Sequence, residues 1–242
     1  MTTTPLPTDA PANLRDVRGL RTHDGRIVRR GALYRSEALR PAAAREADVP
    51  VWPPAVVIDL RAPEERTGPH PLDDGTTAVH SIPLGRSLAP ALAERTTQPD
   101  LARAYRLLAE DAAQEIARIV GLVAEAGGPV LVHCTAGKDR TGIVVAVLLR
   151  AVGVTRADVR ADYLRTEANL PRLWAALHAA GVPTPRNRAL LGVQATALDA
   201  VLDELEAQPG GVPGWLLARG VPQRHLDLLA VRLLGTGYQD AA

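Results

Sequence analysis

Short apolar runs along the chain predict a set of buried strands. Residues 55–60 form an almost continuous apolar run after two prolines, and residues 130–132 form a second run. Their length and β-branched side chains are typical of strands that are buried on both faces of a sheet. A further strand is predicted at 78–84. The pattern therefore predicts a sheet in the core of the fold.

Longer stretches follow a helical period. Between residues 99 and 126, apolar side chains recur at steps of three or four, which predicts one amphipathic helix. Residues 141–152 are almost wholly apolar, so we expect a buried helix there. Thr155 followed by Asp158 resembles a capping box at the start of another helix. Helices are expected from that point to residue 234, with breaks around 181–185 and 210–213. Strands and helices together indicate an α/β fold.

The composition fits one large domain. The chain has 242 residues, of which 46% are hydrophobic and 23% charged, as in an ordinary globular protein. A chain of this length can bury a sizeable core without disulfides or metals. Residues 1–12 are rich in Thr and Pro, so we expect a flexible N-terminus followed by a single domain over 13–242. The sequence indicates no oligomeric state.

The same composition argues against several classes of protein. No apolar run approaches the roughly 18 residues of a transmembrane helix. The N-terminus lacks the basic region and apolar core of a secretory signal peptide. We therefore expect a cytoplasmic protein, with secretion without such a signal as the alternative. The net charge of +1 gives no reason to expect nucleic acid as a partner. One cysteine, with no CxxC or HExxH motif, predicts neither a disulfide nor a zinc site.

Two rare residues lie close together in the sequence. Of the 28 basic residues, 27 are arginine, and the single lysine, Lys138, follows the single cysteine, Cys134, by four positions. Chance is a weak explanation for this proximity in a chain that otherwise avoids both residue types. We therefore place the candidate site at this segment.

The segment from His133 to Gly142 has the pattern of a strand, a tight loop and the start of a helix. Backbone N–H groups of such a loop point inward as an anion nest, and the helix N-terminus adds partial positive charge. Arg140 can present two N–H groups to two phosphate oxygens. Cys134 lies in this positive field, which favours the nucleophilic thiolate. The spacing Cys-x5-Arg is typical of cysteine-dependent phosphatases. Asp139 after the lysine, in place of Ser or Thr, argues against a Walker A loop.

The full string His-Cys-x-Ala-Gly-Lys-Asp-Arg-Thr-Gly resembles the loop of the atypical bacterial protein-tyrosine phosphatases, a family with a secreted member in mycobacteria. The similarity covers about residues 13–235 and includes the segments 13–16, 33–36, 59–61, 161–164 and 215–221. It implies the phosphatase fold, a central, mainly parallel sheet flanked by helices, with a helical C-terminal part. It also implies hydrolysis of phosphotyrosine without metal or cofactor, with phosphoserine, phosphothreonine and phosphoinositides sometimes accepted.

The family resemblance also raises the question of a lid. Its mycobacterial member covers the site with a long helical lid, and the corresponding stretch of this chain is 86–128. A short lid within that stretch, with residues 87–95 as one half, is compatible with the sequence. An ordinary packed helix around Tyr105 is equally compatible with it.

The residues of the loop are given the following roles. Cys134 is the predicted nucleophile and Arg140 the predicted phosphate clamp. Thr141 is expected to donate a hydrogen bond to the Cys134 sulfur or to cap the helix, and His133 to orient the loop. Lys138 is expected to place a second cation at the rim. Backbone groups expected to bind the phosphate oxygens run from Thr135 to Arg140, and thus include those of Thr135, Ala136, Gly137 and Lys138.

Two aspartates are candidates for the general acid that protonates the leaving oxygen. Asp139 lies within the loop, so its position relative to a bound phosphate is fixed, and we favour it slightly. Asp59 ends a predicted strand, and the family resemblance implies a catalytic aspartate there. The structural alternatives are an ion pair of Asp59 with Arg61, and a salt bridge of Asp139 with Arg15 or Arg35.

Several functions are compatible with this loop. The leading prediction is a protein-tyrosine phosphatase that acts on phosphoproteins through a phosphocysteine intermediate. The alternative is a phosphoinositide phosphatase, which the adjacent Lys138 and Asp139 favour. A non-catalytic phosphate-binding module is disfavoured, since Cys134, Asp139 and Arg140 are all present. A rhodanese-like sulfurtransferase is disfavoured by the Arg-Thr-Gly that opens the helix.

Overall fold

The centre of the fold is a five-stranded, mainly parallel sheet. The computed structural model describes residues 11–40, 49–85, 88, 100–185 and 190–235. The sheet has the order β1-β2-β5-β3-β4, with β1 antiparallel to β2 and every other neighbour parallel. The predicted strands at 55–60, 78–84 and 130–132 are confirmed. The strands are β1 (Arg15–Asp16), β2 (Leu33–Ser36), β3 (Val56–Asp59), β4 (Ala78–Ser81) and β5 (Val130–His133).

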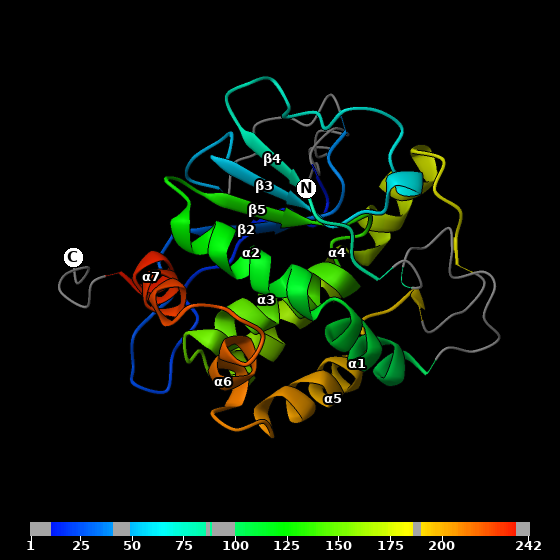
Figure 1. The fold of residues 1–242 in the computed structure, drawn as a ribbon. Coiled ribbons are helices and arrows are strands. Elements are labelled where there is room, and N and C mark those ends of the chain that lie inside the picture. The colour runs from blue at the N-terminus through cyan, green and yellow to red at the C-terminus, as the bar shows by residue number, and fades with distance from the viewer. Residues whose placement is uncertain (1–10, 41–48, 86–87, 89–99, 186–189, 236–242) are drawn as a thin grey trace, which may run out of the picture.

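Seven helices accompany the sheet in the described residues, and α2 and α3 lie along one face of it (Figure 1). The predicted α/β fold is confirmed. A short 3-10 helix, Pro63–Glu65, follows β3. The helices are α1 (Leu101–Asp111), α2 (Ala113–Glu125), α3 (Asp139–Ala151), α4 (Arg156–Ala179), α5 (Ala195–Glu206), α6 (Gly211–Leu217) and α7 (Gln223–Leu234).

Alternate residues of the strands face two separate cores. Val130 and Val132 of β5 belong to the large core on the helical side, whereas Leu131 packs on the opposite face. That opposite face is covered by side chains from loops, among them Leu39 and Trp52. Because successive side chains of a strand alternate, His133 follows Leu131 toward the loop side, and Cys134 follows Val132 into the large core.

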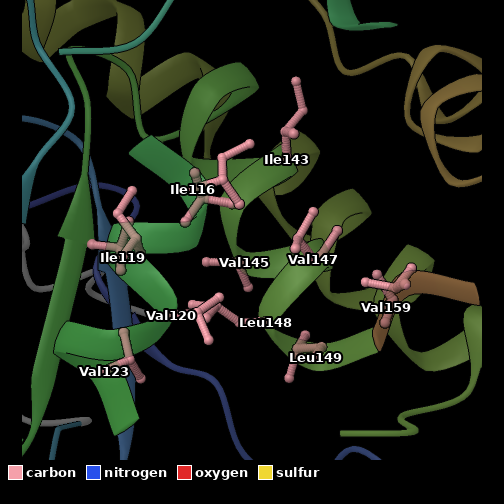
Figure 2. Packing of buried hydrophobic residues seen from close by; sticks show 14 of the residues in the cluster. Ile116, Ile119, Val120, Val123, Ile143, Val145, Val147, Leu148, Leu149 and Val159 are labelled. Carbon is pink, nitrogen blue, oxygen red and sulfur yellow. The ribbon is translucent and has the colours of Figure 1, made fainter. Parts of the chain in front are cut away.

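The large core is built mainly by aliphatic side chains of the helices (Figure 2). The sequence predicts one helix over 99–126, but this stretch forms two helices. They are separated at Ala112, which has non-helical dihedral angles, with φ −101° and ψ 21°. The two halves pack on different partners, α1 on α5 and α2 on α7. The change of direction at Ala112 allows both contacts.

The C-terminal helices follow the expected order with two differences. The Thr155 hydroxyl caps α4 by accepting from the Asp158 N–H at 3.2 Å. The Asp158 carboxylate, however, accepts from the backbone of Arg21 instead of completing the predicted box. The break predicted at 210–213 begins earlier, because α6 already starts at Gly211 and holds Pro213 in its first turn, where proline is tolerated.

Two predictions about the chain's outer parts fall largely outside the described residues. The expected flexible N-terminus lies mostly there, since the description begins at residue 11, and Ala12 is already buried with its N–H bonded to Glu37. The predicted lid segment 87–95 also lies outside the described residues except for Leu88, while α1 and α2 contribute to the core. In the described part of the chain, no helix is long and apolar enough to cross a membrane.

Candidate active site

The loop between β5 and α3 brings together the predicted site residues other than Asp59. Cys134 follows the last residue of β5 and is buried, and α3 begins at Asp139. Gly137 has φ +62°, and a Cβ at this position would lie 2.3 Å from the carbonyl oxygen of Ser36. Only glycine fits such a close approach with positive φ. The loop is therefore packed tightly against the end of β2, with the N-terminus of α3 beside it.

Arg140 is buried and held by a carboxylate that sequence reasoning missed. Its Nη1 and Nη2 atoms donate to the two oxygens of Glu65 at 2.6 and 2.7 Å. Burial opposes the charge of Arg140, but the hydrogen bonds and charge of Glu65 outweigh it and raise the pKa of the guanidinium. The Nε atom is buried without a hydrogen-bond partner in the described part of the chain. One donor of the clamp thus remains available to a ligand.

Glu65 connects the 3-10 helix after β3 to the loop. Besides Arg140, its carboxylate accepts from the Thr135 hydroxyl and from the backbone N–H of Ala62 at 2.9 Å. Burial alone would raise the pKa of Glu65, but the hydrogen bonds donated by Arg140 and the positive charge of its guanidinium lower it on balance. Nothing in the sequence distinguishes this residue from the adjacent Glu64, because its role depends on how the segment after β3 folds over the loop.

Asp139 is anchored by one of its carboxylate oxygens. Oδ1 accepts from the Lys138 ammonium at 2.7 Å and from the Tyr105 hydroxyl. Lys138 is only 1% exposed, so the structure places it inside the site and not at the predicted rim. A buried ammonium requires a counter-charge, and Asp139 supplies it.

The arginines considered as partners of Asp139 bind another aspartate. Arg15 Nε lies 3.0 Å from Asp162 Oδ1, and Arg35 Nη1 lies 2.6 Å from Asp162 Oδ2. Burial opposes the charge of Asp162, but the charges of both arginines lower its pKa on balance. Arg35 also donates to the carbonyl oxygen of Gly137 at 3.0 Å. This ion-pair cluster therefore connects β1, β2 and α4 to the loop.

Asp59 lies in a different cluster, on the loop side of the sheet. Its oxygens accept from Arg61 Nε at 2.9 Å and Nη2 at 2.8 Å. This is the ion pair with Arg61 that is the structural alternative to a catalytic role for Asp59. Burial opposes ionisation, but the hydrogen bonds from Arg61 lower the pKa of Asp59 to about 2. His133 Nε2 is 3.8 Å away. The structure does not bring Asp59 into hydrogen-bond contact with Asp139.

His133 contacts both the loop backbone and a second imidazole. His70 Nδ1 accepts from the N–H of Leu72, so its Nε2 carries the proton and donates to His133 Nε2 at 3.1 Å. The Nδ1–H of His133 then donates to the Cys134 carbonyl oxygen at 3.3 Å. Burial lowers the pKa of His133 to about 4, which keeps the ring neutral. The ring therefore contacts the loop through its backbone.

Thr141 makes neither of its two predicted contacts. Its hydroxyl is fully buried and has no hydrogen-bond partner within the described residues. The predicted hydrogen bond to the Cys134 sulfur is therefore not formed in this structure, and neither is the alternative cap of the helix. The hydroxyl is a second unpaired group in the first turn of α3, where Arg140 Nε is the first.

A pocket of about 340 Å³ opens beside the loop. Thr135 and Glu65 form part of its lining, and apolar side chains that include Leu39, Leu177 and Val182 form another part. The space therefore offers an apolar wall next to the loop. Among the described residues, no group of three or more His, Cys, Asp or Glu side chains could hold a metal ion.

The chain is similar to known proteins over most of its length. The sequence profile of the tyrosine phosphatase family matches residues 6–235. A putative tyrosine-protein phosphatase of Cupriavidus necator is 32% identical, and the match covers 86% of this chain and 81% of the relative. The triple specificity protein phosphatase PtpB of Mycobacterium tuberculosis is 31% identical, with 92% and 96% covered. A tyrosine-protein phosphatase of Nostoc commune is 37% identical over 46% of this chain and 41% of the relative.

Proposed function

The chain belongs to the tyrosine phosphatase family, and on this premise we propose that Cys134, Arg140 and Asp139 carry out its hydrolysis of phosphotyrosine. The observation that carries the proposal is the pair of buried, unpaired polar groups at the start of α3, Arg140 Nε and Thr141 Oγ1. Buried polar groups are normally paired. A phosphate bound in the loop would pair both groups and would lie at the positive end of the helix dipole.

In the first step, the Cys134 thiolate attacks the phosphorus of the substrate. A P–S bond forms while the P–O bond to the leaving oxygen breaks, and Asp139 gives its proton to that oxygen. Arg140 and the loop backbone stabilise the charge on the three remaining phosphate oxygens. Glu65 holds two nitrogens of the Arg140 guanidinium, which fixes the direction of the Nε–H.

In the second step, water hydrolyses the phosphocysteine. The Asp139 carboxylate takes a proton from the water as its oxygen attacks the phosphorus, the P–S bond breaks, and inorganic phosphate leaves with the Cys134 thiolate restored. Asp139 is preferred over Asp59 for both proton transfers because only one of its oxygens is anchored. Both oxygens of Asp59 are engaged by Arg61, and its pKa of about 2 disfavours the protonated form that an acid needs.

The substrate class follows from the pocket and from Lys138. The apolar wall of the pocket beside Thr135 suits the aromatic ring or a neighbouring side chain of a phosphotyrosine protein. Phosphoserine and phosphothreonine proteins are further proposed substrates, because the loop recognises the phosphate itself. The adjacent Lys138 and Asp139 are the basis of the phosphoinositide alternative. Lys138 is buried against Asp139, and the cations that line the pocket are Arg40 and Arg61.

Replacing the nucleophile tests the proposal directly. Cys134→Ser should reduce turnover of a phosphotyrosine peptide and of p-nitrophenyl phosphate by at least about 100-fold, since a hydroxyl is a far weaker nucleophile at neutral pH. Phosphate should still bind, because Arg140 and the backbone nest are unchanged. Steady-state rates and inorganic phosphate binding by calorimetry measure the two effects.

Two results would contradict this assignment. Turnover by Cys134→Ser close to that of the wild type would show that another group attacks the phosphorus. Loss of wild-type turnover in EDTA, with recovery on adding zinc or magnesium, would show that the reaction needs a metal; we expect no effect of EDTA. A thermal unfolding curve of the variant provides the control for folding.

A further inference from the structure

Two tyrosine hydroxyls are buried directly behind Asp139. Tyr105 comes from α1 and Tyr163 from α4, and both side chains are almost completely inaccessible. The Tyr105 hydroxyl is bonded to Asp139 Oδ1, and the two hydroxyls lie 2.8 Å apart. Burying a hydroxyl is costly unless it is paired. Two of the four tyrosines of the protein thus belong to one hydrogen-bonded chain that ends at Asp139.

The direction of this hydrogen-bonded chain follows from its ends. Asp139 Oδ1 accepts hydrogen bonds both in the ionised carboxylate and when a proton is on Oδ2, so Tyr105 donates to Asp139. The Tyr105 oxygen then accepts from the Tyr163 hydroxyl, and the Tyr163 oxygen accepts from the backbone N–H of Gln194. Each donor polarises the next one in such a chain. Burial and the charge of Asp139 raise the pKa of Tyr105 well above its usual value, so its proton stays in place.

The two oxygens of Asp139 therefore have different surroundings. Oδ1 receives the Tyr105 hydroxyl and the Lys138 ammonium. Oδ2 receives no hydrogen bond from any residue that the structure describes, and the Asp139 side chain keeps 11% of its surface exposed. The anchored oxygen fixes the plane of the carboxylate, and the other oxygen is left to exchange a proton.

We propose that Tyr105, supported by Tyr163, is a positioning residue that holds Asp139 so that Oδ2 faces the leaving oxygen of the substrate. This inference rests on the proposed role of Asp139 as general acid and base. It assigns to α1, which the sequence marks only as a helix, a direct influence on the proton transfer. Tyr105 itself does not touch the reacting atoms.

The packing around Tyr163 supports the same arrangement. A Cβ added at Gly142 would lie 2.8 Å from two carbons of the Tyr163 ring. The glycine in the first turn of α3 thus allows the ring to lie flush against the helix that carries Asp139. The hydroxyl of Tyr163 reaches Tyr105 from that position.

Tyr105→Phe tests the proposal on two esters with different leaving groups. Phenyl phosphate has a poor leaving oxygen that needs protonation, whereas p-nitrophenyl phosphate hardly needs it. A general acid contributes about 10²–10⁴-fold, so a misdirected one should cost about tenfold in kcat/KM on phenyl phosphate, which reports the step that protonates the leaving oxygen. On p-nitrophenyl phosphate the loss in kcat/KM should stay below about twofold.

Tyr34→Phe is the matched control. It also removes a buried tyrosine hydroxyl, which accepts from the N–H of Val51 at 3.2 Å on the loop side of the sheet. This variant should leave the ratio of the two kcat/KM values unchanged. Tyr163→Phe should shift the ratio in the same direction as Tyr105→Phe but by less, since Tyr105 can still donate to Asp139. It also provides a second test should Tyr105→Phe fold poorly.

The double variant with Asp139→Asn separates the possible outcomes. If Tyr105 acts through Asp139, adding Tyr105→Phe to Asp139→Asn should change kcat/KM on phenyl phosphate by less than about twofold. Equal losses on both esters for Tyr105→Phe, with a selective loss for Asp139→Asn, would overturn the positioning role alone. If Asp139→Asn is itself unselective, the acid assignment fails and the positioning role fails with it.

Discussion

The two candidates for the general acid differ in how many of their carboxylate oxygens are already hydrogen-bonded. Asp59 gives both oxygens to Arg61, whereas Asp139 gives one oxygen to Lys138 and Tyr105. A carboxylate that must pick up and release a proton needs an oxygen that is not tied to a cation. The hydrogen bonds of each residue therefore matter more for its role than its distance from Cys134 in sequence.

Asp139→Asn and Asp59→Asn should separate these roles. The Asp139 variant should lose about 10²-fold or more in kcat/KM on phenyl phosphate and much less on p-nitrophenyl phosphate. We use kcat/KM because it reports the first step and excludes the hydrolysis of the phosphocysteine, which both esters share. The Asp59 variant should affect both esters alike and by a smaller factor, because its carboxylate is a structural partner of Arg61. Steady-state kinetics on both esters measure this. A selective loss in Asp59→Asn, with a uniform loss in Asp139→Asn, would reverse the assignment.

At the residue scale, the sequence predicts the part of the site that lies within one segment of the chain. Cys134, Asp139 and Arg140 lie within one strand–loop–helix segment, so their proximity follows from the chain itself. Glu65 and Tyr105 reach the same loop from segments about 70 and 30 residues earlier. Their contacts depend on how the 3-10 helix and α1 pack, which no local pattern specifies. For the same reason the burial of Lys138 could not be predicted.

At the element scale, periodicity predicts which segments are helical but not where each one turns. The stretch 99–126 has one continuous apolar period, yet α1 and α2 separate at Ala112 because they pack on α5 and α7. The strands were easier to predict, since a buried strand is marked by its own apolar run. Contacts between elements also explain why position 142 is a glycine, since the absence of a side chain there lets α4 approach α3.

Gly142→Ala should weaken the contact between α3 and α4. Alanine favours a helix by about 1 kcal/mol over glycine, but its Cβ would clash with the Tyr163 ring at 2.8 Å. Overpacking of this kind typically costs about 1–3 kcal/mol, so we expect a net loss in the free energy of unfolding. Urea unfolding measures it. Gly68→Ala is the control, as nothing lies within 4 Å of its added Cβ. Equal or higher stability of Gly142→Ala would refute the close packing.

At the scale of the whole molecule, buried ionisable groups stabilise the contacts between helices, strands and loops. The Asp162 cluster connects β1, β2 and α4 to the loop, and Glu65 connects the 3-10 helix to α3. His70 and His133 connect the loop after β3 to β5. The imidazoles are neutral in the folded state, whereas the carboxylates are ionised. Acid therefore weakens the contacts made by imidazoles and those made by carboxylates in different ranges of pH.

Stability should fall as the pH is lowered from about 6.5 to 4. The pKa of His133 is about 4 in the folded protein, lowered chiefly by burial, and about 6.5 in an unfolded chain. The unfolded state thus binds the proton first, so the stabilisation is complete above the unfolded pKa and is lost as the pH falls toward the folded one. Carboxylates with lowered pKa values, such as Asp59, contribute mainly below this range.

The loss expected from His133 is about 3 kcal/mol, from a shift of roughly two to three pKa units at 1.36 kcal/mol each. Urea unfolding at pH 7, 5.5 and 4 measures it. His133→Gln should remove most of the slope in this range, since an amide can still donate to the Cys134 carbonyl oxygen but does not titrate. His178→Gln, at the exposed end of α4, should keep the slope of the wild type. A slope that survives in His133→Gln would mean that other groups set the acid sensitivity, among them His70, whose pKa burial also lowers.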